Sequence, residues 1–393
     1  MNLHESAADA AFRAEVRAWM AEHLGREFAP LRGVAGPGVP DYDVALAKRW
    51  EQVLAAGAYV GIGWPRSAGG RELPLAQQVI FHEEYVRCGG PGRIGHIGET
   101  LLAPTLIAFG TPEQKARFLP GILAGSAYWA QGYSEPGAGS DLAAVATRAA
   151  LDASGDDPVW VLHGQKVWTS WAAESDWIFV LARTEPGSTR HQGLTLLLVP
   201  LDQPGITIRP IRQITGSAEF NEVFFDGART EGSLHLGAVG EGWKVAMALL
   251  GFERGASTLG QQAYFRHDLD TVIAVARDNG AARDPVIRQR IARAELGLRT
   301  LRFHALRVLG AQDEAAPPPA AMISKYAWSN WHRDLGRLAV DVLGAQGDID
   351  EDGDPRCRAL QMLWLSSRAE TIYAGTNEIQ LNLIAERALG MPR

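Results

Sequence analysis

The sequence predicts an α+β fold in which helices come first, a β domain follows and a helical bundle ends the chain. From Ala10 to about Ala127, apolar residues recur every three or four positions, which is the period of an amphipathic helix. After Tyr128, short β-branched and aromatic runs replace that pattern, and beyond Gly240 the helical period returns. The expected units are an N-terminal helical domain over 1–127, a central antiparallel β domain over 128–239 and a C-terminal helical bundle over 240–393.

Length and charge limit the possible functions. The chain has 393 residues and 46% hydrophobic composition, enough for a sizeable core in two or three structural units. Its formal charge is −7, from 45 acidic and 38 basic residues, and no run of Lys or Arg could neutralise a row of phosphates. We therefore expect no nucleic-acid partner.

Cysteine, histidine and hydropathy patterns exclude further classes. Cys88 and Cys357 cannot form a disulfide framework, and the ten histidines show no metal-ligand spacing, so we expect no metal site and a reducing, cytoplasmic location. No apolar run approaches the roughly 20 residues that span a bilayer, so we expect no membrane insertion.

Each domain contains local signals that can be tested. The N-terminal stretch is amphipathic and predicts a docking helix; its apolar residues are Phe12, Val16, Trp19 and Met20. The pair His163-Gly164 lies between two apolar runs and predicts a tight hairpin, because glycine supplies positive φ. In the bundle, one stripe predicts a long buried helix face; it consists of Ile287, Ile291, Ala294, Leu298, Leu301, Ala305 and Val308. The prolines within Ala315 to Ala321 predict a break after that helix.

Several common nucleotide and metal motifs are absent. The sequence contains no G-x-x-x-x-G-K-[ST], no H-E-x-x-H, and no strand followed by a G-x-G-x-x-G that opens a helix. A P-loop, a zincin site and a Rossmann-bound cofactor are therefore not expected.

Three segments carry the candidate chemistry. The first block, Gly132 to Asp141, reads GYSEPGAGSD: it is either a plain strand and turn, or a strand end whose N–H groups and hydroxyls cradle an anionic or heteroaromatic ligand. The second block, Lys166 to Trp171, places Trp168 and Ser170 on one strand face, where an indole could stack on a flat ring, although an ordinary half-buried aromatic strand has the same pattern.

The third block, Ile372 to Gln380, reads IYAGTNEIQ and lies close to the C-terminus. Gly375 could simply end one helix and Thr376 cap the next. The same helix N-terminus would also suit a pyrophosphate.

Taken together, in this order and at these separations, the three blocks resemble the acyl-CoA dehydrogenase family, and the resemblance covers essentially the whole chain. It implies an FAD enzyme with the same order of helices, sheet and helices. Tyr133 and Ser134 would contact the flavin pyrimidine edge, Gly139 would be part of the cofactor site, and Ser140 would lie near the cofactor phosphate and the CoA. Trp168 would lie against the isoalloxazine and Ser170 near flavin N5. The resemblance also implies FAD contacts further along the chain, from Gly344, Thr376 and Glu378.

The sequence departs from the family pattern at the base. Many members have the catalytic glutamate just before the Gly-Thr found here at Gly375, where this chain has Ala374. A subset of the family places the base on the first helix of the C-terminal domain, and Phe252-Glu253-Arg254 resembles that arrangement. Glu253 is therefore the expected base, and Arg254 and Ala374 are expected substrate contacts. A surface glutamate paired with a neighbouring arginine is the alternative.

The resemblance implies a reaction and partners. Glu253 would remove the α-proton of an acyl-CoA, the β-hydrogen would leave as hydride to flavin N5, and an electron-transfer flavoprotein would accept the electrons. The family's Arg-Lys-x-Phe-Gly block is missing from Ala276 to Pro285, which leaves open how FAD is held across subunits. A homodimer or homotetramer is implied, with a mixed assembly of two related chains left open. The rival functions are a flavin oxidase or monooxygenase on the same fold, a catalytically silent chain of a mixed oligomer, and a non-enzymatic acyl-binding protein.

Overall fold

The computed structural model describes residues 5–34, 39, 42–252, 257–310, 319–348 and 354–392, and the chain divides into two compact units. The bundle unit comprises Met1–Met20, Leu75–Gly89 and Gly255–Arg393, and the sheet unit comprises Ala21–Pro74 and Gly90–Arg254. Helices precede and follow one β-sheet along the chain, so the predicted α+β fold class is confirmed.

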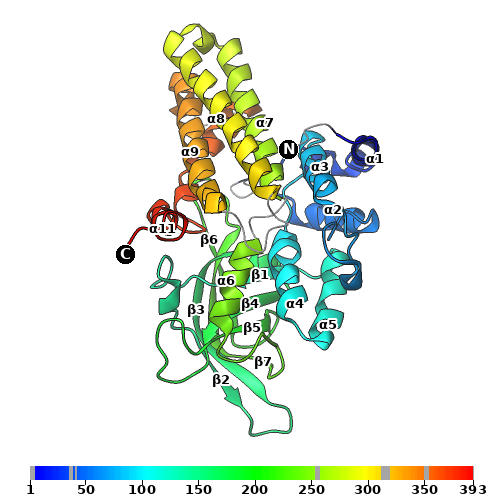
Figure 1. The fold of residues 1–393 in the computed structure, drawn as a ribbon, viewed down its shortest axis with the longest axis vertical. Helices are drawn as coiled ribbons and strands as arrows, with labels where there is room; N and C mark the ends of the chain where they lie inside the picture. Colours follow the sequence, from blue (N-terminus) through cyan, green and yellow to red (C-terminus); the bar gives the residue numbers. More distant parts are fainter. Residues whose placement is uncertain are drawn as a thin grey trace. The chain divides into compact units, whose positions relative to one another are not determined.

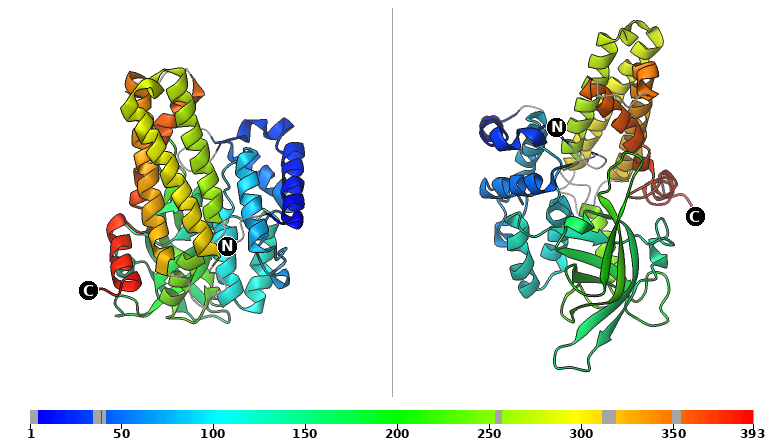
Figure 2. Two further views of the ribbon diagram at one scale, coloured as in Figure 1. Left: turned by 45° about the horizontal axis from the view of Figure 1, so that its top comes forward. Right: turned by 180° about the vertical axis from the view of Figure 1, so that it is seen from behind.

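In the bundle unit the long helices α7 (Ser257–Asp278), α8 (Pro285–Leu309) and α9 (Ile323–Leu343) run side by side (Figures 1 and 2). Asp284 starts the longest of them by accepting a hydrogen bond from Val286 N at 2.7 Å, and Pro285 follows at the first helical position, where its missing N–H costs nothing. The helices are α1 (Ala7–His23), α3 (Leu75–Arg87), α7 (Ser257–Asp278), α8 (Pro285–Leu309), α9 (Ile323–Leu343), α10 (Pro355–Ser366) and α11 (Asn377–Leu383).

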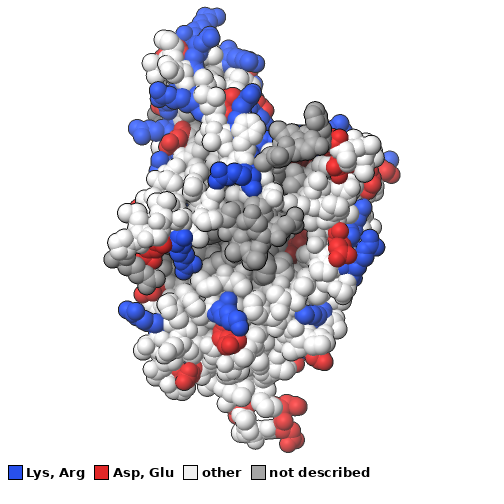
Figure 3. Space-filling model, in the orientation of Figure 1, with Lys and Arg blue, Asp and Glu red and all other residues white. Residues whose placement is uncertain are grey.

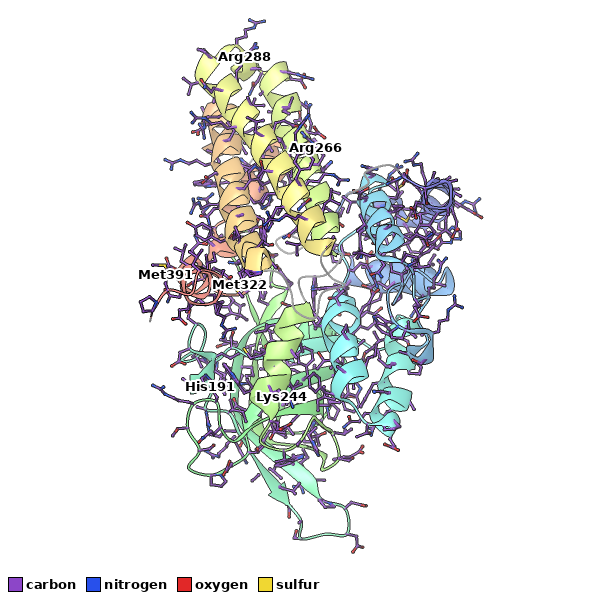
Figure 4. The ribbon with its side chains drawn as sticks, viewed as in Figure 1. His191, Lys244, Arg266, Arg288, Met322 and Met391 are labelled. Carbon is purple, nitrogen blue, oxygen red and sulfur yellow. The ribbon has the colours of Figure 1, made fainter. Side chains whose placement is uncertain are left out.

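The predicted stripe of α8 faces the bundle core. Ile287 and Leu298 belong to the buried core cluster, Ile291 and Ala294 pack against it, and Leu301, Ala305 and Val308 are also buried. The predicted break falls partly on residues 315–318, which lie outside the described residues, but α8 and α9 are separate helices. The C-terminal end of the chain packs near the start of α9, where Figure 4 labels Met322 and Met391.

The N-terminal docking helix is also present. Phe12, Val16 and Met20 are buried along α1, as the amphipathic pattern predicts. Two buried carboxylates on α3, Glu83 and Glu84, strengthen the attachment. Their ion-pair partners come from α1, α3 and α8: Arg13, Arg17, Arg87 and Arg302.

The sheet unit has an apolar core on each face of one sheet. The strands run in the order β6-β7-β3-β2-β4-β5-β8, and β1 pairs with β4 in parallel, a departure from the antiparallel sheet expected. The strands are β1 (Trp129–Gly132), β2 (Arg148–Asp152), β3 (Val159–Ser170), β4 (Trp177–Arg183), β5 (Leu194–Pro200), β6 (Ile206–Ile211), β7 (Phe220–Glu231) and β8 (His235–Leu236). The helices of this unit are α2 (Val44–Ala56), α4 (Ala103–Phe109), α5 (Pro112–Leu123) and α6 (Gly242–Phe252), with α4, α5 and α6 contributing to the core on one face.

The predicted hairpin at His163-Gly164 is wrong. Residues 159–170 form one continuous strand, β3, with a register shift between Leu162 and His163. Gly164 has φ +147°, and a Cβ there would lie 2.5 Å from Thr147 Oγ1 and 2.7 Å from Thr147 Cα. The glycine therefore permits a close approach of backbone to backbone, which sequence alone cannot distinguish from a turn.

On the face shown in Figure 3, Lys and Arg are frequent at the top of the view, Asp and Glu are scattered, and neither sign forms a continuous band. Within the described residues, no helix is both long and apolar enough to cross a membrane.

Candidate active site

The first block leaves the sheet through a tight turn. After β1 ends at Gly132, Glu135 N donates to Ala138 O at 2.9 Å and Ala138 N donates to Glu135 O at 3.0 Å. Gly139 and Ser140 follow this turn and are exposed. A Cβ placed at Gly139 would meet nothing within 4 Å, so the backbone there is open to a ligand.

A buried lysine joins the first block to the second. Lys166 is fully buried on β3, and its Nζ donates to Glu135 Oε1 at 2.7 Å, to Tyr133 O at 3.1 Å and to Leu181 O at 2.8 Å. The neighbouring Val167 N donates to Ser134 O at 2.9 Å. The two predicted blocks therefore lie side by side, as a shared site requires.

The charge on Glu135 is held by several donors. Burial alone would raise the pKa of Glu135, but the Lys166 ammonium and hydrogen bonds from Lys166, Thr147 and Ala146 outweigh it and lower that pKa. The N–H groups of Ala146 and Thr147 donate to the carboxylate at 2.6 and 2.9 Å. Burial lowers the pKa of Lys166 to about 8, and the pair is ionised at neutral pH.

The second block contains a β-bulge at the tryptophan. The register of β3 against β7 shifts between Lys166 and Thr169, and Trp168 has φ +58°. The strand is therefore irregular at Trp168, but Thr169 is buried while Trp168 is exposed and Ser170 is half-buried, and the shared face of Trp168 and Ser170 stays a prediction. The bulge leaves the indole 57% exposed, with its ring edge-on to Phe220 at 6.1 Å.

These residues fit a flat heteroaromatic cofactor. Trp168 offers an exposed ring, and Ser134 and Ser170 are half-buried hydroxyls on the two joined segments. Tyr133 was expected to contact the flavin, but its ring is buried and packs edge-on against Phe179, with 6.0 Å between the ring centres. The ring therefore supports the first block from the core side.

The third block lies in the bundle unit and has the expected local geometry. Thr376 caps α11, its Oγ1 accepting from Ile379 N at 3.2 Å. Gly375 has φ +89°, and a Cβ there would lie 2.6 Å from Gln380 Nε2, so this position requires glycine. Glu378 is exposed in the first turn, where its own N–H and the Thr376 side chain lower its pKa. Its charge would oppose a pyrophosphate placed directly on that helix end.

Side chains of α9 hold the segment that precedes the third block. Lys325 Nζ donates to Glu370 O at 2.7 Å and to Gly375 O at 2.8 Å. His332, two turns further along α9, contacts the Glu370 carboxylate with Nδ1 at 2.8 Å and Asp268 Oδ2 with Nε2 at 3.1 Å. Burial alone would lower the pKa of His332, but hydrogen bonds with Asp268 and Glu370, and their charges, raise it to about 9. The imidazole is therefore protonated at neutral pH.

The predicted residues fall into three groups. Those of the first two blocks lie together in the sheet unit, whereas Gly344, Ala374, Thr376 and Glu378 belong to the bundle unit. Glu253 and Arg254 lie outside the described residues, directly after α6 ends at Phe252. Among the described residues, no group of three or more His, Cys, Asp or Glu side chains could hold a metal ion.

Sequence reasoning missed the supporting lysines. Lys166 binds main-chain carbonyls at the first block, and Lys325 binds main-chain carbonyls at the third block. His332 contacts Glu370, just before the third block. One feature of the sequence could have identified Lys166. It lies in a short run of β-branched and aromatic residues, where a lysine is unusual unless it is paired.

Comparison with known proteins decides the family. Sequence models of the N-terminal, middle and C-terminal domains of acyl-CoA dehydrogenase match residues 6–126, 130–228 and 240–389. The chain is 55% identical over 382 residues to the acyl-CoA dehydrogenase IpdE1 of Mycobacterium tuberculosis, covering 97% of each protein. The chain belongs to the acyl-CoA dehydrogenase family.

Solved structures agree with this assignment. A steroid acyl-CoA dehydrogenase described as Tcur3481-Tcur3483 superposes with a TM-score of 0.86 at 31% identity, covering 100% of both chains. The ChsE4-ChsE5 complex of Mycobacterium tuberculosis gives a TM-score of 0.84 at 26% identity, again with full coverage of both chains.

Membership confirms that this acyl-CoA dehydrogenase homologue is an oxidoreductase, and it implies a flavin cofactor. The non-enzymatic acyl-binding protein is thereby removed as an alternative. The three domain boundaries predicted from sequence, and the roles of individual site residues, stay predictions.

Proposed function

We propose that the chain catalyses the FAD-dependent α,β-dehydrogenation of an acyl-CoA to its trans-2-enoyl-CoA. The observation that carries this proposal is the bulge of β3, which exposes the Trp168 indole beside Ser170 while Lys166 and Val167 hold the first block against the same strand. A stacking ring and hydroxyl donors together suit an isoalloxazine. Ser140 and Gly139, exposed beyond the turn, would then face the phosphate and CoA groups.

Glu253 is the proposed base. Its carboxylate would take the proton from the α carbon, and the electron pair of that C–H bond would form the double bond as hydride leaves the β carbon with its own pair. Trp168, Ser134 and Ser170 would hold the flavin ring of FAD, which would supply the hydride acceptor and the route of two electrons to an electron-transfer flavoprotein. The Ala374 N–H would donate to the thioester oxygen, where negative charge develops, and Arg254 would contact the substrate. Ala374 itself has no group that takes a proton.

A bulky, ring-bearing acyl group is the proposed substrate class. A solved relative at 31% identity is described as a steroid acyl-CoA dehydrogenase. Alanine at position 374, in place of a glutamate, would leave space near the reacting carbons for such a group. A panel of straight-chain, branched and ring-bearing acyl-CoAs, scored by anaerobic bleaching of the flavin, would test this class against simple fatty acyl chains.

Two other roles have specific support. Two solved relatives are described by the names of two different chains, which favours a mixed oligomer, with this chain as either a catalytic or a catalytically silent member. A homodimer or homotetramer is the alternative. Purifying the chain alone and with a co-expressed relative, and measuring mass, FAD content and bleaching of each, separates these assemblies. An oxidase or monooxygenase would instead show rapid reoxidation of the reduced flavin by oxygen.

The decisive experiment concerns the base. Glu253→Gln keeps the size and hydrogen-bonding capacity of the side chain, so FAD content should be unchanged while flavin reduction by substrate falls about 10²–10⁴-fold. Glu241→Gln is the matched control, because Glu241 pairs at 3.6 Å with the exposed Lys244, labelled in Figure 4, at the start of α6. Near wild-type reduction in Glu253→Gln would show that the base lies elsewhere. Release of FMN or of no flavin from the denatured protein would remove the proposed reaction altogether.

A further inference from the structure

The turn at Ala374 and Gly375 is held by side chains from its inner side. Lys325 Nζ binds the carbonyls of Glu370 and Gly375, and Gln380 Nε2 donates to Ala374 O at 3.2 Å. The segment therefore has three of its main-chain carbonyls fixed by side-chain donors within a few residues. Such a density of side chain to backbone contacts specifies the orientation of the peptide groups.

Glu370 is fixed a second time through its carboxylate. His332 contacts both carboxylate oxygens, at 2.9 and 2.8 Å, and is itself held by Asp268. Lys325 and His332 are seven residues apart and lie on one face of α9, which faces the start of this segment. The helix therefore binds Glu370 through main chain and side chain at once.

The Ala374 N–H is not used by these contacts, which all involve main-chain carbonyls. Ala374 has φ +50° and is exposed, and within the described part of the chain no acceptor is found for its N–H. A non-glycine residue in the left-handed region is strained, and such strain persists only where surrounding contacts impose it. Here, the contacts that impose this backbone conformation are the hydrogen bonds accepted by the carbonyls of residues 370, 374 and 375.

We propose that Lys325 is a positioning residue, whose ammonium holds the Glu370 and Gly375 carbonyls so that the Ala374 N–H is aimed at the substrate thioester oxygen. This proposal rests on the dehydrogenation proposed above. Lys325 would not itself touch the substrate. It acts through the peptide group that would stabilise the enolate as the α-proton leaves.

Lys325 is suited to this task because it has donors and no strong competing partner. Among the described residues no carboxylate forms an ion pair with it, and the rings of Tyr373 and Trp328 lie 5.9 and 6.0 Å from its Nζ. Aromatic faces attract a cation without using its N–H groups, so these remain available to the carbonyls. Burial lowers the pKa of Lys325 to about 8, which agrees with its enclosed position.

The test compares Lys325→Met with Lys48→Met in the FAD-loaded protein. Lys48 is the matched control because its Nζ also donates to a main-chain carbonyl, Glu174 O at 2.7 Å, and lies 4.8 Å from the centre of the Tyr128 ring. Both variants lose a lysine that binds backbone beside an aromatic ring. Only the first should affect the substrate carbonyl.

Two readouts separate positioning from stability. The rate of flavin reduction at saturating substrate should fall roughly ten- to a hundredfold in Lys325→Met, somewhat less than the 10²–10³-fold effect of losing an oxyanion donor outright. Acetoacetyl-CoA, an enolisable thioester, supplies the second readout: the pH midpoint at which it becomes the bound enolate should rise by about one unit or more. Binding of a saturated acyl-CoA should change about twofold at most, since the ground-state oxygen carries less charge.

The outcomes are distinct. Unchanged reduction rate and enolisation midpoint in a folded Lys325→Met overturn the proposal and leave Lys325 a stabilising residue. If Lys325→Met does not fold or loses its flavin, Lys325→Arg is used, because it keeps the charge and the donors but alters their geometry. A shifted enolisation midpoint at full FAD content in this variant supports the proposal. A wild-type enolisation midpoint overturns it. Failure of the wild-type protein to be bleached by any acyl-CoA, or to bind FAD, instead overturns the proposed dehydrogenation, and this inference with it.

Discussion

Replacing His332 with glutamine should remove a pH-dependent part of the stability of the bundle unit. His332 is buried, with Asp268 on one ring nitrogen and Glu370 on the other. Glutamine has a similar length and can bond to both carboxylates, but it cannot carry a positive charge. The substitution therefore tests the charge of the imidazolium more than the volume of the side chain.

The magnitude follows from the shifted pKa. A rise from 6.5 to about 9 corresponds, at about 1.36 kcal/mol per unit, to about 3 kcal/mol of stability. Because the pKa is higher in the folded state, the folded protein binds the proton more tightly than the unfolded chain does. This contribution is fully present below about pH 6.5 and is lost as the pH rises through about 9.

The assay is urea unfolding of wild type and His332→Gln at a series of pH values between about 6 and 10. The difference in unfolding free energy between the two proteins should fall by about 3 kcal/mol across that window. His304→Gln is the matched control in the same unit: its Nε2 lies 3.0 Å from Ser324 Oγ, and burial lowers the pKa of His304, so this histidine contributes no stability that is lost as the pH rises. A constant difference between wild type and His332→Gln would refute the reasoning, because it would mean that the imidazole is neutral in the folded protein.

Three further substitutions test the sheet unit. Trp168→Ala should weaken flavin retention and change the visible spectrum, since aromatic stacking contributes about 0.5–1.5 kcal/mol beyond burial. An FAD affinity and spectrum equal to those of the wild type would identify Trp168 as a structural residue only. Lys166→Met should lower the unfolding free energy by about 3–5 kcal/mol, because it leaves the Glu135 carboxylate buried without its partner. Thermal melts of the FAD-free and FAD-loaded protein measure this loss of stability. Gly164→Ala should destabilise by about 2 kcal/mol or more through contact with Thr147, whereas Gly155→Ala, where a Cβ meets nothing within 4 Å, should be nearly neutral in the same melts.

Elements with strong periodicity could be predicted from the sequence. The stripe of α8 and the apolar face of α1 repeat at helical spacing over several turns, so burial on one side is the only arrangement that removes them from water. The two strand runs that make up β3 could also be predicted, but the role of Gly164 between them could not. A glycine required by a close approach and a glycine required by a turn have the same local sequence, and only the position of Thr147 decides between them.

The candidate site could be predicted in its blocks but not in its supports. The order of the three blocks identifies the family, since each block carries several residues at fixed spacing. The bulge at Trp168 depends instead on the pairing of β3 with β7, which spans about fifty residues of sequence and leaves no mark within the block itself. The same holds for His332, whose partners Asp268 and Glu370 are far away along the chain.

The two supporting lysines have a common physical cause. Residues 133–135 leave the strand β1, and residues 374–375 adopt positive φ, so in both places carbonyl groups lose their regular partners while facing protein. A buried carbonyl without a donor costs about 1–3 kcal/mol, and one ammonium with three N–H groups can reach acceptors that approach from different directions. Arginine, with donors fixed in one plane, matches such a set poorly. Lys166 and Lys325 therefore keep two irregular segments in one conformation, and irregular backbone held in one conformation is what a cofactor and a developing oxyanion both require.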